Sequence, residues 1–395
     1  MVLGTRAGFW TAAMVAGLAL WASGAPTMVY PLYAQAWELT PATTAAIFAV
    51  YPLTLIPVLV LFGNVSDYVG RRAAMLAGLG ALAAGSLAFG LALDLGWVFV
   101  GRALMGVGVG LSLGPASAAV VDFSPAGRAG RASSVTTAAT ATGLALATLI
   151  GGALVQHGPA PLHLTFWVLF AVTVVAFALV WFLPGGVAAG AGERWRPHRP
   201  SIPAGSQAMF WSGALGIAGA YAMGAIYLAL GAQVARDLVG SADALVGGAI
   251  ISLSAVSIGV VAVLTRRLTP RLAVTLGPVA ASAGLGLLVL AGITHSLLFF
   301  LGSSLVGGAG YSLLFAGGLG LVTRSAPAHQ RAAVMSSAYV VGYLLQALAA
   351  LGIGALATGG GLLEALELGS PIVLGIGLAA LVLANGGRRA AAVPL

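Results

Sequence analysis

A succession of long apolar runs, separated by short polar stretches, is the sequence feature that most restricts how this chain can fold. A helix needs about 20 residues to cross a bilayer, and it satisfies its own backbone hydrogen bonds there. We predict twelve crossing helices, at residues 8–35, 41–63, 72–93, 96–121, 130–156, 162–183, 208–234, 243–264, 271–293, 296–323, 330–357 and 370–386. Ten or eleven crossings are also compatible with the sequence, because three glycines at 359–361 obscure where the last run starts.

The composition supports a membrane protein over other classes. Hydrophobic residues make up 60% of the 395 residues and charged residues only 7%, whereas a soluble domain carries about 25% charged residues. This balance excludes an ordinary soluble globule and a disordered chain. The absence of Cys excludes disulfides and thiolate metal sites. The predicted fold class is therefore an all-α polytopic membrane protein.

The arginines indicate how the chain is oriented. The formal net charge of +8 raises the question of nucleic-acid binding, but the arginines are scattered between apolar runs and form no patch, so we expect no nucleic-acid partner. If the N-terminus is inside, every Arg except Arg102 and Arg236 falls on the inner side of the membrane. Inner loops are enriched in Arg and Lys. We predict a multi-pass protein of the cell (inner) membrane, in contact with lipids, with both termini cytoplasmic.

The longest polar connection divides the chain into two halves. It covers residues 184–207 and is expected to be a cytoplasmic linker between an N-terminal six-helix bundle (1–183) and a C-terminal one (208–395). The halves also repeat a glycine pattern, GVGVG at 106–110 and GAGYS at 308–312. The offset is 308 − 106 = 202 residues. Duplicated halves are a common way to build transporters.

The loop between the second and third predicted helices reads GNVSDYVGRR, from Gly63 to Arg72. We expect Gly63 to permit close helix packing and Gly70 to adopt a positive φ in a turn. Arg71 and Arg72 hold the loop on the inner side, and Asp67 can accept hydrogen bonds from backbone N–H groups or pair with an Arg.

This loop resembles the cytoplasmic signature of the major facilitator superfamily. The resemblance covers nearly the whole chain and implies twelve crossings in two six-helix bundles, with a role for Asp67 in latching the bundles together. The chain departs from the signature at Tyr68, where the family commonly has Arg, and the equivalent loop at 265–272 has no Asp. The resemblance therefore implies a weaker or one-sided latch.

Arg102 is the only clear charge inside a predicted crossing. It begins Arg102-x3-Gly106-x-Gly108-x-Gly110, which resembles the fourth-helix motif of the family, with Met105 where Gln is usual. A buried Arg stays charged and needs partners or water. Two interpretations are open. The side chain faces the cavity and binds an anion or takes part in proton coupling, or it extends outward to the lipid headgroups.

Proton coupling has no evident acid, since no Asp or Glu lies deep in a predicted crossing. Asp67 and Asp122, near the inner surface, are the candidates. In the fifth crossing Gly143 fits an antiporter motif, but Ala147 and Thr148 replace its Gly-Pro pair, so this helix carries either a packing face or a hinge. The predicted coupling and gating residues are Gly63, Asp67, Gly70, Arg71, Arg72, Arg102 and Asp122.

Side chains with hydroxyl, phenol and amide groups inside the crossings are the expected contacts for a ligand. In the first crossing Thr27 and Tyr30 share a helix face, and in the eleventh Tyr339, Tyr343 and Gln346 share another. The alternative for a Tyr is a place at the membrane interface, which suits Tyr227 better than these. Prolines of the first two crossings are expected to bend them. The predicted substrate-binding residues are Thr27, Tyr30, Tyr51, Arg102, Tyr227, Tyr311, Tyr339, Tyr343 and Gln346.

The sequence thus favours a secondary active transporter that moves a small organic solute by alternating access. We expect proton-coupled efflux of an amphipathic or aromatic compound by a monomer, in an antiporter-like manner, with a proton gradient and no bound cofactor. One alternative is a proton-coupled importer or facilitator of an anionic nutrient. A different class is a lipid scramblase or a membrane-embedded enzyme, but no metal cluster, nucleophile motif or paired intramembrane acids support an enzyme.

Overall fold

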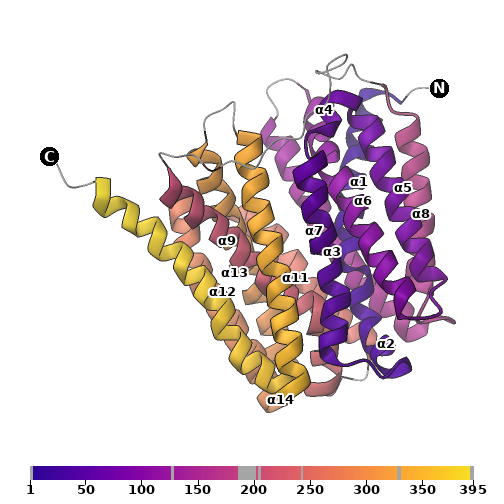
Figure 1. Ribbon diagram of the computed structural model, residues 1–395, viewed down its shortest axis with the longest axis vertical. Helices are drawn as coiled ribbons and strands as arrows, with labels where there is room; N and C mark the ends of the chain where they lie inside the picture. Colours follow the sequence, from indigo (N-terminus) through magenta and orange to yellow (C-terminus); the bar gives the residue numbers. More distant parts are fainter. Residues whose placement is uncertain are drawn as a thin grey trace. The chain divides into compact units, whose positions relative to one another are not determined.

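The computed structural model describes residues 3–125, 129–185, 202, 206–241, 243–326 and 331–391. In these residues every regular element is a helix (Figure 1). The first half contains α1 (Thr5–Gly24), η1 (Ala25–Met28), α2 (Tyr30–Ala36), α3 (Pro41–Phe62), α4 (Val65–Val69), α5 (Arg71–Gly90), α6 (Leu95–Asp122), α7 (Ala129–His157) and α8 (Leu164–Trp181). The second half contains α9 (Gln207–Ala225), η2 (Ile226–Leu230), α10 (Gly231–Gln233), η3 (Val234–Leu238), α11 (Ala244–Leu264), α12 (Pro270–Thr294), α13 (Leu297–Ser325) and α14 (Arg331–Ala391).

These helices make twelve membrane crossings. Eleven continuous helical stretches of the described chain are long and apolar enough to cross a bilayer. The last of them, α14, has 61 residues and bends at Gly361, where φ is 90°. At 1.5 Å per residue it would measure about 90 Å, roughly three times the thickness of the hydrocarbon core. Its two arms, orange and yellow in Figure 1, are therefore two crossings.

The predicted spans agree with the structure to within a few residues, except at the last one. The prediction of a connection up to residue 369 is wrong, because the chain is helical again directly after Gly361. Glu364 and Glu367 suggested a loop, but both are exposed while Ala365 and Leu366 between them are buried. One helical turn accommodates this alternation.

Two compact units make up the chain. Unit 1 contains residues 1–33 and 50–198, and unit 2 contains residues 34–49 and 199–395. In unit 2 the backbone N–H of Ala42 donates to the hydroxyl of Thr358 at 2.9 Å. The domain boundaries drawn from the sequence, on either side of the linker, stay a prediction.

Unit 1 relies on close helix contacts at glycines of α6. A Cβ atom on Gly106 would lie 2.6 Å from the carbonyl oxygen of Tyr51 on α3. A Cβ atom on Gly108 would lie 2.7 Å from the carbonyl oxygen of Gly78 on α5. Side chains larger than hydrogen would push these helices apart. The glycine pattern therefore sets how α6 packs on its two neighbours.

Unit 2 repeats these contacts at the offset of 202 residues. A Cβ atom on Gly308 of α13 would lie 2.8 Å from Cβ of Ser257 on α11. A Cβ atom on Gly310 would lie 2.7 Å from Cα of Ala281 on α12. The same pair of glycines thus contacts the second and third crossings of its own half in both units. The repeat seen in the sequence is a repeat of packing.

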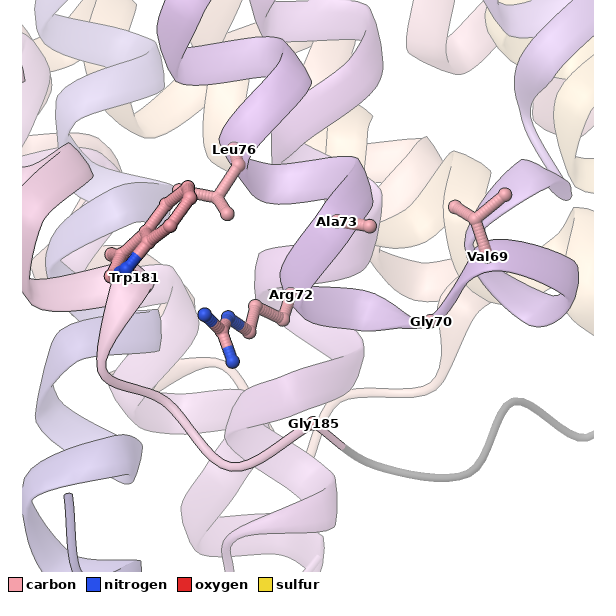
Figure 2. Close-up of a pocket in the computed structure, with 7 residues that line it drawn as sticks. All are labelled: Val69, Gly70, Arg72, Ala73, Leu76, Trp181 and Gly185. Atoms are coloured by element: carbon pink, nitrogen blue, oxygen red, sulfur yellow. The ribbon is translucent and has the colours of Figure 1, made fainter. Parts of the chain in front are cut away.

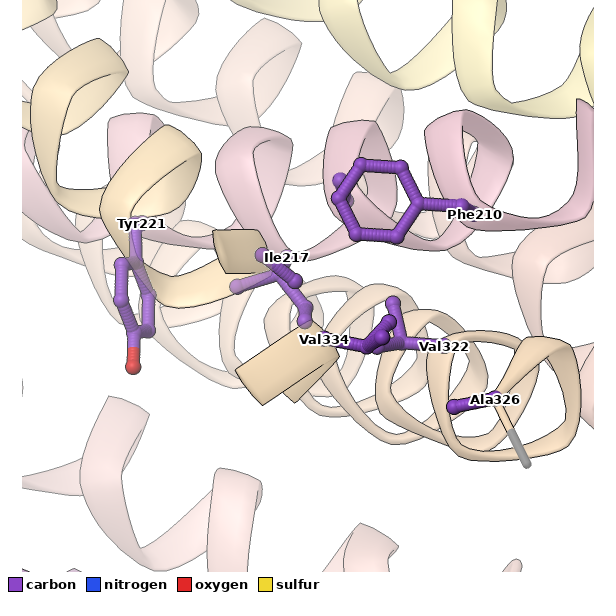
Figure 3. Packing of buried hydrophobic residues seen from close by; sticks show 8 residues of the cluster. Phe210, Ile217, Tyr221, Val322, Ala326 and Val334 are labelled. Atoms are coloured by element: carbon purple, nitrogen blue, oxygen red, sulfur yellow. The ribbon is translucent and has the colours of Figure 1, made fainter. Parts of the chain in front are cut away.

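A hydrophobic cluster on α9, α13 and α14 forms one part of the core of unit 2 (Figure 3). Phe210, Ile217, Val322 and Val334 have no exposed surface. Tyr221 lies at one end of this cluster, and its ring continues the buried surface toward a group of other aromatic side chains.

The first crossing of each half is interrupted. In unit 1 the α-helix changes to a 3₁₀ turn at Ala25–Met28, which contains Pro26, as the prolines predicted. In unit 2 it changes to π-helical turns at Ile226–Leu230 and Val234–Leu238. Adding 202 to 25 and 28 gives 227 and 230, so the interruptions coincide in the repeat. The second crossing, α3, stays one helix with Pro52 and Pro57 inside it.

Candidate functional site

Arg102 lies two turns into α6 and is enclosed by three other elements of unit 1. Its side chain has no exposed surface. Nη1 donates a hydrogen bond to the carbonyl oxygen of Ser23 at the end of α1, at 3.1 Å. The guanidinium carbon lies 5.2 Å from the ring centre of Tyr51 on α3 and 5.9 Å from that of Tyr30 on α2. Both distances suit a cation–π interaction.

This environment answers the question of where Arg102 points. A side chain that extended to the headgroups would expose its guanidinium, whereas this one is covered by protein on all sides. The predicted residues Tyr30 and Tyr51 are gathered around it, and Thr27, also buried, lies in the 3₁₀ turn that precedes Tyr30. The structure therefore brings four of the predicted residues together in unit 1, around one permanent cation.

A second group of predicted residues gathers in unit 2 around Tyr221. The ring centre of Tyr221 on α9 lies 4.8 Å from that of Tyr343 on α14 and 6.4 Å from that of Tyr311 on α13. Phe315 stacks 5.8 Å from Tyr221 and 6.2 Å from Tyr311. We call Tyr221, Tyr311, Phe315 and Tyr343 the aromatic cluster. Such ring pairs stabilise one another and offer flat faces to a ligand ring.

Tyr339 and Gln346 extend this surface along α14. They stand four residues before and three residues after Tyr343, so all three share one face of the helix. Tyr339 packs against the same core as the aromatic cluster. Gln346 is buried, and its Oε1 accepts no hydrogen bond from the described part of the chain. A buried amide oxygen without a donor is a candidate contact for a solute N–H or O–H group.

Sequence reasoning missed Tyr221 and Phe315, and it included Tyr227, which the structure does not bring into the cluster. Tyr227 is buried, and its hydroxyl donates to the carbonyl oxygen of Ser303 at 3.0 Å. That bond connects the first π-helical turn to α13. The only sequence signal for Tyr221 is a phenol in a run of small residues, GAYAMGA.

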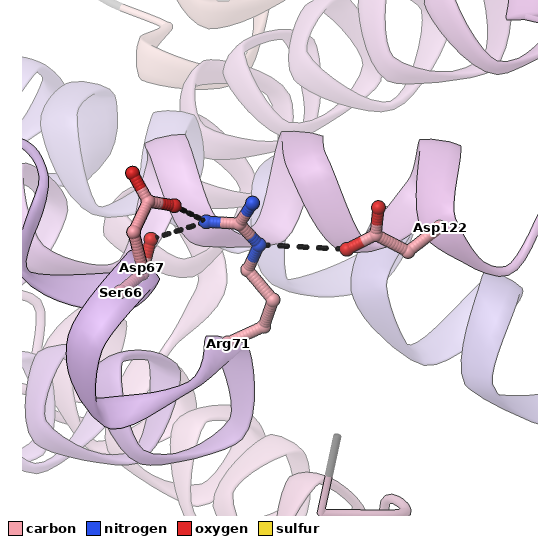
Figure 4. A network of polar contacts seen from close by, with 4 residues as sticks. All are labelled: Ser66, Asp67, Arg71 and Asp122. Carbon is pink, nitrogen blue, oxygen red and sulfur yellow. Dashed lines mark hydrogen bonds and ion pairs between the residues drawn. The ribbon is translucent and has the colours of Figure 1, made fainter. Parts of the chain in front are cut away.

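Three of the predicted gating residues, Asp67, Arg71 and Asp122, meet with Ser66 in a polar network at one end of unit 1 (Figure 4). Nη1 of Arg71 donates to Oδ1 of Asp67 at 2.6 Å and to the hydroxyl of Ser66 at 2.6 Å. Nε of Arg71 lies 3.4 Å from Oδ2 of Asp122 at the end of α6. Arg71 thus connects α4, α5 and α6, and it brings together both acids that the sequence proposed for coupling.

The glycines of this loop act on the backbone. Gly70 separates α4 from α5 with a φ of 87°, as predicted, and this conformation is costly for any residue with a side chain. The interpretation of Gly63 as a packing residue stays a prediction. Gly63 is exposed, and a Cβ atom there would lie 2.5 Å from the carbonyl oxygen of Leu59 in its own turn. Arg72 points away from the network and lies over the ring of Trp181, 5.5 Å from its centre.

Solved structures of several transporters share this architecture. A bacterial homologue of the human lysosomal transporter Spinster, inward-facing and unoccupied, is 14% identical with a TM-score of 0.76, covering 96% of this chain and 97% of that one. A POT family transporter in complex with 5-aminolevulinic acid is 15% identical with a TM-score of 0.76, covering 97% and 96%. The nucleoside transporter NupG is 14% identical with a TM-score of 0.74, covering 96% and 98%.

At these identities the similarity shows the fold alone. No curated protein matches the sequence significantly. The family model described as Major Facilitator Superfamily matches residues 9–350, which is most of the chain. With twelve crossings, a repeated glycine packing in the two halves and the Asp67–Arg71 loop in place, the chain belongs to the major facilitator superfamily of membrane transporters.

Proposed function

We propose that this protein is a proton-coupled exporter that moves a small amphipathic or aromatic compound by alternating access. The observation that carries the proposal is the aromatic cluster of unit 2. The ring centre of Tyr221 lies 4.8 to 6.4 Å from those of the other three rings, and Gln346 offers a buried acceptor on the same helix face as Tyr343. A flat solute ring with a hydrogen-bond donor matches these groups in shape and in chemistry.

The coupling part of the proposal rests on the charged residues of unit 1. The guanidinium of Arg102 presents a positive charge to an anion or proton carrier that approaches it. Asp67 and Asp122 are the acids that share Arg71. A proton arriving at either acid would remove one of the partners of Arg71 and loosen the loop between α4 and α5.

The second candidate function is uptake of an anionic nutrient, which the burial of Arg102 favours. A guanidinium held in protein is a strong and specific contact for carboxylate or phosphate. In either case we propose that the protein works as a monomer in the cell membrane with both termini in the cytoplasm, since that orientation places most arginines inside. The small solute and the surrounding lipids are its proposed partners.

Transport by purified protein in liposomes tests this proposal. A panel of aromatic amphiphiles and anionic metabolites is offered with an imposed pH gradient in each direction. We expect only aromatic compounds to move, driven by the proton gradient. Tyr221→Leu and Tyr343→Leu should raise the KM for them by about tenfold each, because lost ring contacts cost about 0.5–1.5 kcal/mol beyond the lost burial.

Phe170→Leu is the matched control, because it removes an aromatic ring on α8, outside the aromatic cluster. This variant should transport normally. If only anionic metabolites move, export of aromatic compounds is refuted and uptake of an anionic nutrient is supported. Transport without any dependence on the pH gradient would refute the coupling and leave a facilitator.

A further inference from the structure

A groove lies at one end of unit 1, between the start of α5 and the end of α8 (Figure 2). It has a volume of about 290 Å³. The lining residues are Val69, Gly70, Arg72, Ala73, Leu76, Trp181 and Gly185. The guanidinium of Arg72 projects into it beneath the indole of Trp181 (Figure 2). Among the described residues, one cation therefore faces a surface that is otherwise apolar, and no carboxylate lines it.

Arg72 keeps its hydrogen-bond donors for a ligand. Its neighbour Arg71 holds the acids of this loop, Asp67 and Asp122. Within the described residues the guanidinium carbon of Arg72 lies over the ring of Trp181, and no carboxylate is paired with this Arg. Five N–H donors in a rigid fork match the oxygens of a phosphate group in bidentate fashion.

The polarity of the groove changes along the helix axis. Leu76 stands four residues after Arg72, on the same face of α5 and one turn further into the crossing. Trp181 closes the end of α8, is 54% exposed, and is followed by the exposed Phe182. Since α5 and α8 are both crossing helices, Arg72 and Trp181 lie at the level of the headgroups, where Trp is enriched, and Leu76 lies at the level of the acyl chains.

We propose that this groove binds the headgroup of an anionic phospholipid, with its phosphate on Arg72 and the first carbons of its acyl chains along Leu76 and Trp181. Charge complementarity and the matching order of polar and apolar groups carry the assignment. Basic pockets between crossing helices are suited to such lipids. Gly70 belongs both to the groove and to the turn that carries Arg71, so a bound lipid also restrains the loop that holds Asp67.

Binding of dioleoyl phosphatidylglycerol to the purified protein in detergent tests the proposal. Native mass spectrometry counts bound lipids, and the rise in melting temperature on adding the lipid gives an apparent affinity. Dioleoyl phosphatidylcholine and inorganic phosphate are the comparison ligands. We expect phosphatidylglycerol to bind best, and Arg72→Gln to weaken it about tenfold by removing charged hydrogen bonds. Trp181→Leu should weaken it as well.

Arg267→Gln is the matched control, because Arg267 is an exposed loop arginine of the second half. It should bind phosphatidylglycerol like the unaltered protein. Equal binding by Arg72→Gln, or an equal loss in Arg267→Gln, would overturn the proposal. Equal protection by inorganic phosphate would show a free-phosphate site instead. If Arg72→Gln does not fold, Arg72→Lys is tested in its place, because it keeps the charge but loses the planar guanidinium. Unaltered affinity of this variant for phosphatidylglycerol would overturn the bidentate contact.

Discussion

At the scale of single residues, Arg102 has no counterpart in the second half. The equivalent position, 102 + 202 = 304, is Ser304, and both side chains are completely buried. The hydroxyl of Ser304 makes no hydrogen bond within the described chain. A buried Arg is retained only where its surroundings stabilise the charge, here through the Ser23 carbonyl and the rings of Tyr30 and Tyr51. The repeat is therefore asymmetric at this position, with a buried cation in unit 1 and a buried hydroxyl in unit 2.

The first substitution to make is Arg102→Ala. We expect it to abolish gradient-driven transport while the protein still folds, because the glycines of α6 keep their packing. Arg102→Lys should retain part of the activity, since it keeps the charge but loses the planar group that faces Tyr51. Liposome transport under a fixed pH gradient measures both, with the exposed Arg267→Ala as the control. Near-normal transport by Arg102→Ala would mean that Arg102 has a structural role only.

At the scale of elements, backbone contacts at small residues decide which helices lie together. α7 crosses α1 so closely that a Cβ atom on Gly143 would collide with Gly17, 2.6 Å from its carbonyl carbon. Close packing against α1 therefore explains why a glycine stands at position 143. This is the first of the two interpretations of the fifth crossing, a packing face. Between helices in a membrane, such packing provides much of the association energy, because lipid tails are as apolar as the side chains.

Gly143→Ala should therefore destabilise unit 1 by about 1–3 kcal/mol, the usual cost of overpacking. Gly80→Ala on α5 is the matched control. Nothing lies within 4 Å of a Cβ atom there, so it should be neutral or stabilise the helix by up to about 1 kcal/mol. Melting temperatures in detergent separate the two. A Gly143→Ala protein as stable as the control would show that α1 and α7 separate easily, as a hinge requires.

At the scale of the whole molecule, the arginines define the proposed orientation in the membrane. The loop between α5 and α6 contains no Arg, and Leu93 in it is 82% exposed. The loop between α11 and α12 contains Arg266 and Arg267, both exposed. Translocation of positive loops is disfavoured, so these two loops should lie on opposite sides of the bilayer.

Single cysteines can check this directly, because the chain contains none. Leu93→Cys should react with a membrane-impermeant maleimide on intact cells. Arg267→Cys should react only after the cells are permeabilised. Ser201, in the predicted linker, would suit the same test but lies outside the described residues. Labelling of Arg267→Cys on intact cells would reverse the orientation and move the Asp67 loop to the outer side.

The sequence by itself determined the helices of this protein and the nature of its charged residues. Crossing helices follow from the length and hydropathy of local runs, so eleven of twelve ranges agree with the structure. The positive φ of Gly70 follows from a single residue in a known local setting. The sequence left two directions open for the side chain of Arg102, and only the structure showed that it is buried. The predicted connection before the last crossing was wrong, because the single residue Gly361 suffices to reverse the chain where the sequence suggested a loop.

Only the tertiary structure decided which side chains meet. Tyr221 became the centre of the aromatic cluster because α13 and α14 bring Tyr311 and Tyr343 to it from far along the chain. The adjacent residues Arg71 and Arg72 took different partners, an acid pair and Trp181, because successive side chains on a helix point about 100° apart. Helical spacing tells which residues share a face, but the partner of that face depends on long-range packing, which no local pattern encodes.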